Sequence, residues 1–127
     1  AYLAGRSGLV HAATGTGKTL AAWLGPVLDY LAEQPDPAAW NPKDPPPLRV
    51  LWVTPLRALA ADTAASLEAP INGLGLPWAV QTRTGDTRSS VKAKQRDRLP
   101  TALVTTPESL CLMLTWPDTR ARFADLR

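Results

Sequence analysis

Apolar residues along this chain gather in short runs that alternate with longer segments of helical periodicity. Four such runs cover residues 8–12, 48–54, 78–82 and 102–106, and a turn signal follows each of them. The second and fourth runs are rich in valine and leucine and do not alternate with polar residues, which is typical of strands buried in a parallel sheet. The pattern predicts four short β-strands.

Helix candidates lie between these strands. Residues 18–33 carry apolar side chains at a spacing of three and four, as a helix with one apolar face does: Leu20, Leu24, Val27, Leu28 and Leu31. Residues 56–69 are rich in alanine, residues 107–115 begin with proline and an acidic residue, and residues 89–99 are a basic helix candidate. This alternation predicts an α/β fold whose mainly parallel sheet is flanked by helices.

Residues 35–47 contain six prolines, which cannot continue a helix and favour an extended, exposed loop. We expect this loop to lie within one domain, or part of one, that spans residues 1–127. No apolar run approaches the roughly 18 residues of a membrane span. The single cysteine, Cys111, excludes an internal disulfide and fits a reducing compartment. We expect Cys111 and His11, which both lie in apolar surroundings, to be buried.

The net charge of +3 says little by itself, but the charges are unevenly distributed. Residues 83–98 hold six Lys and Arg against two Asp, a local charge of +4. Such a segment can bind an anion such as nucleic-acid phosphate, or it can be the solvated face of a surface helix. The sequence leaves both interpretations open.

The stretch ATGTGKT, residues 13–19, has the composition of a phosphate-binding loop. Gly15 and Gly17 let backbone N–H groups approach a phosphate closely, and the helix that follows adds unpaired donors and partial positive charge. Lys18 can reach the β- and γ-phosphates of ATP, and the hydroxyl of Thr19 can ligate Mg²⁺. A glycine-rich turn with an incidental lysine is the alternative, but the predicted strand–loop–helix context favours nucleotide binding.

A P-loop enzyme that hydrolyses ATP also needs an acidic residue at the end of another strand to hold Mg²⁺. None of the four predicted strands ends in Asp or Glu. Either the site is inactive, or the acidic strand follows Arg127. We expect the second, because a complete sheet of this kind usually has more than four strands. Residues 1–127 alone are then expected not to hydrolyse ATP.

In open α/β sheets, ligands bind at the carboxyl ends of the strands. Those ends read ATGTGKT, TPLRAL (54–59), TRTGDT (82–87) and TTPESL (105–110). Hydroxyls, backbone N–H groups and Arg57 along one edge would suit a phosphate backbone, which such groups contact without reading the bases. Taken singly, each junction could be no more than a helix cap made by Thr or Ser.

Taken in order, AATGTGKT (12–19), TPLRALA (54–60) and TTPESL resemble motifs I, Ia and Ib of superfamily 2 helicases. Motif I of that superfamily reads A-x-x-G-x-G-K-T, which accounts for Ala12 where the general P-loop pattern has glycine. TPLRALA departs from the PTRELA of DEAD-box proteins. RTGDT (83–87) together with TTPESL is closer to the Lhr-type DEXH-box helicases. The alanine- and arginine-rich composition most resembles their ligase-associated bacterial branch.

The resemblance implies an N-terminal portion of the first RecA-like domain of an ATP-dependent DNA helicase or translocase. It implies a role in DNA repair, with DNA-repair proteins as partners, in the bacterial cytoplasm. ATP and Mg²⁺ would be bound by Ala13, Thr14, Gly15, Thr16, Gly17, Lys18 and Thr19, with Lys18 and Thr19 catalytic and Thr19 the metal ligand. The D-E-x-H motif of the family is expected to follow Leu126.

The resemblance also implies a single-stranded or partly duplex nucleic acid as partner, with DNA favoured. It would be contacted by Thr54, Pro55, Arg57, Thr105, Thr106 and Glu108, with Gly85 and Asp86 on a loop between these contacts. Two other functions fit part of the sequence. A small-molecule P-loop kinase leaves TPLR and TTPES unexplained, and a non-catalytic nucleic-acid-binding module would carry a vestigial P-loop.

Overall fold

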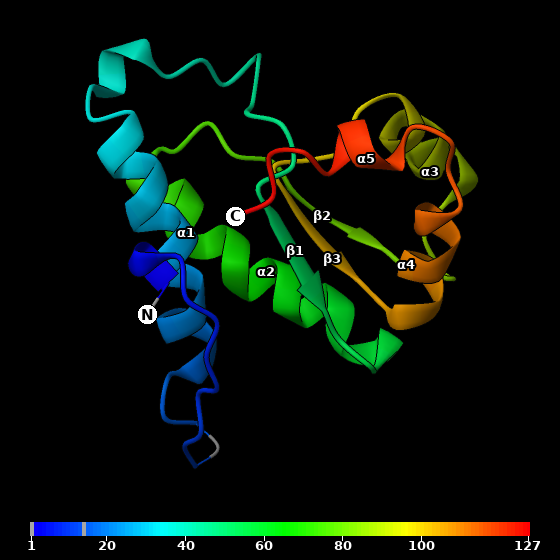
Figure 1. Cartoon of the computed structure of the whole chain (residues 1–127), viewed down its shortest axis with the longest axis horizontal. Helices are drawn as coiled ribbons and strands as arrows, with labels where there is room; N and C mark the ends of the chain where they lie inside the picture. The colour runs from blue at the N-terminus through cyan, green and yellow to red at the C-terminus, as the bar shows by residue number, and fades with distance from the viewer. Residues whose placement is uncertain (1, 14) are drawn as a thin grey trace. The chain divides into compact units, whose positions relative to one another are not determined.

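The computed structural model describes residues 2–13 and 15–127 (Figure 1). The chain divides into two compact units, Ala1–Trp40 and Asn41–Arg127. The boundary lies inside the proline-rich loop predicted over residues 35–47, which is largely exposed as expected and includes the short 3-10 helix η2 (Pro37–Ala39). That these units belong to one domain stays a prediction.

The first unit contains the 3-10 helix η1 (Tyr2–Ala4) and helix α1 (Lys18–Glu33), which has the limits predicted for it. The helix continues through Pro26, although this residue has no N–H to donate to the preceding turn.

The face of α1 that is buried differs from the predicted one. Trp23, Pro26, Val27 and Tyr30 are buried, whereas Leu20, Leu24 and Leu28 are 43–49% exposed. The two sets form neighbouring stripes of one helix. Of the five residues on the predicted apolar face, only Val27 is buried. Aromatic side chains remove more surface from water than leucine does, which favours burial of the stripe that holds Trp23 and Tyr30.

The first predicted strand is wrong. Residues 8–12 are an exposed irregular segment, and His11, which we expected in the core, is exposed with them. A strand in a parallel sheet is held by a ladder of hydrogen bonds to its neighbours. Within the described part of the chain no strand pairs with residues 8–12, so the short apolar run has nothing to hold it extended.

The second unit is built on a three-stranded parallel sheet in the order β1–β3–β2. Its strands are β1 (Val50–Val53), β2 (Val80–Arg83) and β3 (Ala102–Thr105). The first and third lie within their predicted runs, and β2 overlaps its run and extends one residue beyond it. All four residues of the central strand β3 are buried, as the continuous apolar run predicts. The α/β fold with a parallel sheet is therefore confirmed.

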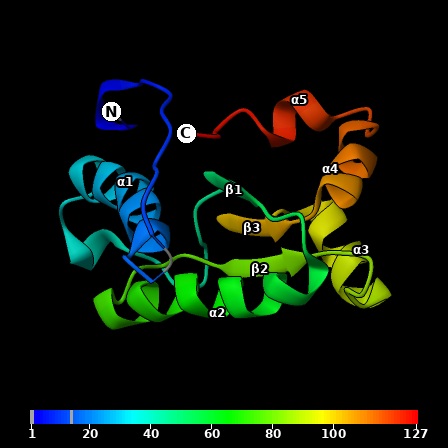
Figure 2. The same ribbon diagram turned by 90° about the horizontal axis from the view of Figure 1, so that it is seen from below.

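Helices cover both faces of this sheet. Helix α2 (Arg57–Leu74) packs against β2 and β3 on one face, while α4 (Pro107–Leu114) and α5 (Thr119–Arg122) lie toward the other (Figure 2). Helix α3 (Ser89–Asp97) confirms the basic helix candidate. Helix α2 runs beyond its predicted end at residue 69, through Pro70, and Gly75 terminates it in the left-handed conformation at φ 67°.

The core on the α4 side contains Leu48, Leu99, Leu103 and Met113. Ser109 and Met113 are buried, but Cys111 is exposed, so its predicted burial is wrong. A residue two positions away on a helix points about 200° around the axis, so Cys111 faces away from the core that Met113 enters. Within the described residues, no helix is long and apolar enough to cross a membrane.

Candidate functional site

The predicted phosphate-binding loop of the first unit has the backbone that its glycines were expected to provide. Gly15 and Gly17 adopt φ values of 79° and 82°, in the left-handed region that other residues rarely enter. A Cβ atom built on either glycine would meet no other atom within 4 Å, so open space lies beside the loop. Gly17 is also the N-cap of the 16-residue helix α1 and offers its first N–H groups no side-chain cap.

Side chains of this loop turn back onto its own carbonyl groups. The ammonium of the half-buried Lys18 donates to the carbonyl oxygens of Ala12 and Ala13, at 2.6 Å each, and the hydroxyl of Thr16 donates to Ala13 at 2.7 Å. A phosphate would offer the Lys18 ammonium an ionised acceptor and hence a stronger, charge-assisted bond. The open loop, the uncapped helix start and the lysine therefore fit a nucleotide phosphate. The predicted contact Thr14 lies outside the described residues.

Thr19 is exposed in the first turn of α1. Among the residues that the structure describes, no three His, Cys, Asp or Glu side chains come together to hold a metal ion. A Mg²⁺ ion at Thr19 fits the usual habit of this ion, which takes few protein ligands and completes its shell with phosphate oxygens and water.

The predicted nucleic-acid contacts of the second unit come together at one edge of its sheet. The three strands end level, because Val53 pairs with Thr105 and Thr105 with Arg83 in the two ladders. The segments that lead into α2, α3 and α4 therefore begin at the same edge. The sequence prediction that these strand ends are neighbours is confirmed for this unit.

Three threonines hold this edge together through internal hydrogen bonds. The backbone N–H of Thr54 donates to the carbonyl of Thr105 at 2.9 Å, and the hydroxyl of Thr105 donates to the carbonyl of Arg83 at 2.7 Å. The hydroxyl of Thr106 lies 3.4 Å from that of Ser109. All three threonines are buried, so their contact with a nucleic acid stays a prediction.

The exposed members of the predicted set surround Arg57. Its Nη1 lies 3.5 Å from the carboxylate of Asp86, and the same guanidinium lies beside the backbone of Gly85. A pocket of about 330 Å³ beside them is lined by Arg57, Ala58, Ala60, Ala61, Thr82, Thr84, Asp86 and Thr87. Pro55 is exposed at the same strand end.

Glu108 completes the exposed set at the start of α4. A hydrogen bond from its own backbone N–H and a second from the Thr106 hydroxyl lower the pKa of the Glu108 carboxyl, and the charge of Arg57 lowers it further. The carboxylate therefore stays ionised at neutral pH, within the electrostatic reach of Arg57.

Some cations of the basic segment 83–98 bond to other groups of the same unit. Arg83 donates to the carbonyl of Lys92 and to the side chain of Gln95, both at 3.2 Å. Arg98 pairs with Asp44 at 2.8 Å, which fastens the end of the proline-rich loop to the end of α3. Most residues of α3 are nevertheless exposed, as the solvated-helix interpretation expects, and anion binding by this segment stays a prediction.

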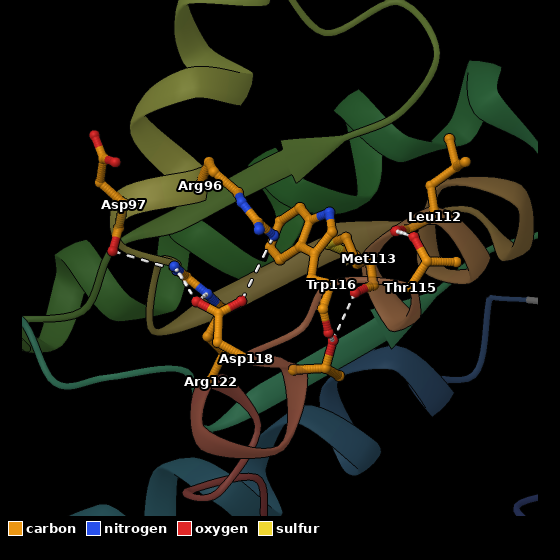
Figure 3. A network of polar contacts seen from close by, with 9 residues as sticks. Arg96, Asp97, Leu112, Met113, Thr115, Trp116, Asp118 and Arg122 are labelled. Carbon is orange, nitrogen blue, oxygen red and sulfur yellow. Dashed lines mark hydrogen bonds and ion pairs between the residues drawn. The ribbon is translucent and has the colours of Figure 1, made fainter.

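A second cluster, missed by the sequence reasoning, surrounds Trp116 (Figure 3). The guanidinium carbons of Arg96, Arg83 and Arg122 lie 4.2, 4.9 and 5.6 Å from the centroid of its ring. Burial and then the charge of Arg96 lower the pKa of the Arg83 guanidinium. Tryptophan is the aromatic side chain that best attracts such cations.

Asp118 supplies a carboxylate to this cluster. It lies 2.7 Å from Arg122 and 3.7 Å from Arg96, and Arg122 also donates to the carbonyl of Asp97 at 3.3 Å. The bond from Arg122 is the main reason that the pKa of Asp118 is lowered. The cluster ties the turn between α4 and α5 to α3. The only signal of it in the sequence was the density of arginine near a tryptophan.

Comparison with known proteins gives consistent matches along the chain. A family model described as DEAD/DEAH box helicase matches residues 1–127. The Lhr helicase/probable uracil glycosylase of Mycolicibacterium smegmatis is 43% identical over 121 residues, which cover 87% of this chain and 8% of that protein.

Two solved structures have the same fold. Mycobacterium smegmatis helicase Lhr bound to ssDNA and AMP-PNP matches 98% of this chain and 16% of its own, with a TM-score of 0.74 and 38% identity. The DEAD-box helicase Mss116 bound to ssRNA and UDP-BeF matches 91% of this chain and 22% of its own, with a TM-score of 0.66 and 25% identity. The chain thus spans less than a quarter of each relative. With its phosphate-binding loop, its level strand ends and these matches, the chain belongs to the DEAD/DEAH box helicase family and is related to the Lhr-type helicases.

Proposed function

We propose that this chain is the ATP-binding part of an ATP-dependent DNA helicase or translocase. The observation that carries the proposal is the loop of Gly15, Gly17 and Lys18 at the start of α1, in a chain of the helicase family. The relative from Mycobacterium smegmatis, solved with AMP-PNP and ssDNA, supports both a nucleotide and a single strand as ligands.

Different groups of the loop would bind different parts of ATP–Mg²⁺. Backbone N–H groups from Ala13 to Gly17 would surround the phosphates, Lys18 would exchange its two carbonyl acceptors for phosphate oxygens, and the Thr19 hydroxyl would ligate the metal. Bound ATP–Mg²⁺ would supply the free energy of phosphoanhydride hydrolysis. An acidic motif from elsewhere in the full-length protein would be needed for turnover, so residues 1–127 alone should bind ATP without hydrolysing it.

The nucleic acid would run along the edge where β1, β2 and β3 end. Pro55, Arg57 and Glu108 would face it, with Gly85 and Asp86 on the loop between them, while Thr54, Thr105 and Thr106 hold the edge in shape. Among these residues Arg57 is the cation that would neutralise a phosphate, without reading a base. The ssDNA of the Lhr structure favours DNA over the ssRNA of the Mss116 structure. A role in DNA repair, membership of the ligase-associated branch and a bacterial cytoplasmic location belong to the same proposal.

The nucleotide site is tested by Lys18→Ala in the full-length protein. We expect loss of ATP hydrolysis and of unwinding, because the ammonium that would bind the phosphates is gone. Lys94→Ala, which removes an equal charge from the exposed surface of α3, is the matched control and should leave both activities intact. Normal unwinding by the Lys18 variant would refute the assignment.

Single-stranded DNA also separates this proposal from its two rivals. A helicase should hydrolyse ATP faster when single-stranded DNA is added. A small-molecule P-loop kinase should not respond to DNA, and a non-catalytic module with a vestigial P-loop should bind DNA without any ATP turnover.

The nucleic-acid edge is tested by Arg57→Ala in the same protein. Affinity for single strands should fall by a similar factor for unrelated sequences, because a phosphate contact carries no base information. The slope of log affinity against log salt should become shallower by no more than about 0.7, the value for one phosphate contact on a single strand. Unchanged binding would remove Arg57 from the proposed interface.

A further inference from the structure

The first turn of α2 is a place where a negative charge is favoured. Its N-cap residue, Leu56, provides no side-chain cap, and the first turn contains no acidic residue. The helix begins instead with the cation of Arg57, which adds to the partial positive charge of the helix N-terminus. An anion brought from elsewhere would be attracted by both.

Asp86 supplies that anion from the loop after β2. Its carboxylate lies 3.5 Å from Nη1 of Arg57, and the two side chains are 76% and 61% exposed. Both residues line the open pocket of about 330 Å³ at this edge. Exposed pairs of this kind contribute little to stability, so the guanidinium can leave Asp86 for a competing anion at small cost.

The loop that carries Asp86 is held in place by its own hydrogen bonds. The N–H of Asp86 donates to the hydroxyl of Thr84 at 3.2 Å, and the N–H of Thr84 donates to the hydroxyl of Thr87 at 2.9 Å. The ammonium of Lys92 on α3 donates to the carbonyl of Gly85 at 3.0 Å. The carboxylate of Asp86 is therefore presented to Arg57 by a fixed turn.

Gly85 leaves the space in which the guanidinium lies. A Cβ atom on Gly85 would be 2.9 Å from Nη1 and 3.4 Å from Cζ of Arg57. Gly85 is not among the glycines with positive φ, so alanine fits its backbone. The atoms in the way are the far end of a flexible side chain, so alanine at this position would move the guanidinium and leave the turn intact.

We propose that Asp86 is an internal competitor for the phosphate of the nucleic acid, and that Gly85 and Asp86 are positioning residues that act on the strand through Arg57. This inference rests on the proposed function of the same edge. Without nucleic acid, the Asp86 carboxylate holds Arg57 over the pocket in an extended pose. A phosphate that binds the guanidinium in place of Asp86 leaves the Asp86 carboxylate unpaired beside it. Repulsion between these two anions then weakens the complex.

Competition of this kind changes the salt dependence as well as the affinity. A phosphate that binds Arg57 releases the cation condensed on the strand, but the Asp86 carboxylate that it leaves unpaired attracts a cation in exchange, so the net release is small. When the carboxylate is removed, the same contact releases the counterion of the phosphate in full. Asp86 should therefore flatten the salt slope of the wild-type protein, an effect that a purely structural residue would not have.

The test measures the affinity of the full-length protein for a fluorescently labelled single-stranded oligothymidylate by anisotropy, over a series of salt concentrations. Asp86→Asn should bind about two- to fivefold more tightly at low salt, as expected for one exposed charge at this distance. Its salt slope should be steeper by up to about 0.7, and its advantage should fade at high salt. Gly85→Ala keeps every charge but displaces Arg57, and it should bind more weakly.

Two further variants isolate the mechanism. Asp44→Asn removes an exposed carboxylate that pairs with Arg98, so it makes the same change in net charge away from this edge and should have no effect. In an Arg57→Ala background, the gain from Asp86→Asn should fall to half or less. Damage to the turn would weaken binding in both the Asp86 and the Gly85 variants, whereas competition predicts opposite signs.

The outcomes distinguish this inference from the function on which it rests. If Arg57→Ala weakens binding and Asp86→Asn leaves it unchanged or weaker, the competition is refuted and the proposed interface stands. Equal gains in Asp86→Asn and Asp44→Asn would also refute it, because they would reflect net charge alone. If Arg57→Ala binds normally, the role of Arg57 in the proposed interface fails, and the competition fails with it.

Discussion

The cations with proposed functions already have partners within the protein. Lys18 donates to two carbonyl groups of its own loop, and Arg57 lies beside the carboxylate of Asp86. Each ligand must therefore offer a better acceptor than the one it replaces, and an ionised phosphate does so for both. The internal partners already restrict each side chain to one conformation, which reduces the conformational entropy lost on binding.

Trp116 shows a different use of cations, because Arg83, Arg96 and Arg122 pack around its ring. Trp116→Leu should loosen the attachment of the α4–α5 turn and lower the local free energy of unfolding by about 2–3 kcal/mol. Trp116→Phe, which keeps an aromatic face, should cost about half as much. Hydrogen exchange of the α3 amides in the full-length protein measures both, and equal losses in the two variants would show that ring chemistry is unimportant.

Asp118 in the same cluster makes a contribution to stability that depends on pH. Because Arg122 lowers its pKa in the folded protein, the contribution is fully present above the pKa of an unfolded Asp, about 3.9. It is lost as the pH falls through the lower folded value. The difference in thermal stability between the wild type and Asp118→Asn should therefore be constant from neutral pH to about pH 5 and shrink in stronger acid. A difference that grows on acidification would contradict this assignment.

At the scale of elements, the level ends of three parallel strands create the proposed interface. The register pairs Val53, Thr105 and Arg83 across the sheet, so three loops start side by side although they are far apart in the sequence. The central strand β3 holds this edge through hydrogen bonds to both neighbours. A local change in β3 should therefore disturb the geometry of the edge before it removes any contact with a ligand.

Thr105→Val tests this distinction. It removes the hydroxyl that donates to the carbonyl of Arg83 and should cost about 1–2 kcal/mol in stability, because a buried acceptor loses its donor. The salt slope of single-strand binding should stay the same, since no charge is involved. A large loss of affinity without loss of stability would instead make Thr105 a direct contact, as the family resemblance implied.

At the scale of the whole molecule, the phosphate-binding loop and the strand-end interface belong to different compact units, Ala1–Trp40 and Asn41–Arg127. The proposed helicase function requires the two sites to be coupled, and coupling in binding is reciprocal. The division into units lies in the proline-rich loop, which Arg98 fastens to the second unit through Asp44. Along the chain, α1, the proline-rich loop and β1 lie between the two sites.

Coupling predicts that AMP-PNP changes the affinity of the full-length protein for single-stranded DNA. Lys18→Ala should abolish this response and keep the affinity measured without nucleotide, because the substitution lies outside the strand-end interface. Anisotropy titrations with and without AMP-PNP measure both quantities. If AMP-PNP has no effect on the wild type, the two sites act independently and the motor function is refuted.

Much of the fold and the order of the candidate site could be predicted because they depend on local rules. Helix α1 starts and ends where its periodicity does, Gly15 and Gly17 have the positive φ that the loop composition indicated, and the three strands of the sheet lie within or beside predicted runs. The strand ends of the second unit lie at one edge as predicted, because parallel strands bring their carboxyl ends to the same edge. The same rules could not say whether a run finds a partner, and residues 8–12 did not.

The sequence by itself determined the glycine-rich loop, the helix that follows it and the succession of strand-end motifs, since each depends on residues within a few positions of one another. The tertiary structure alone decided that Arg57 meets Asp86, that three arginines surround Trp116, and which stripe of α1 is buried. The first two join groups at least 20 residues apart, except for Arg122, which follows Trp116 closely. The physical reason is that electrostatic and packing energies depend on distance in space, and only the completed sheet fixes that distance.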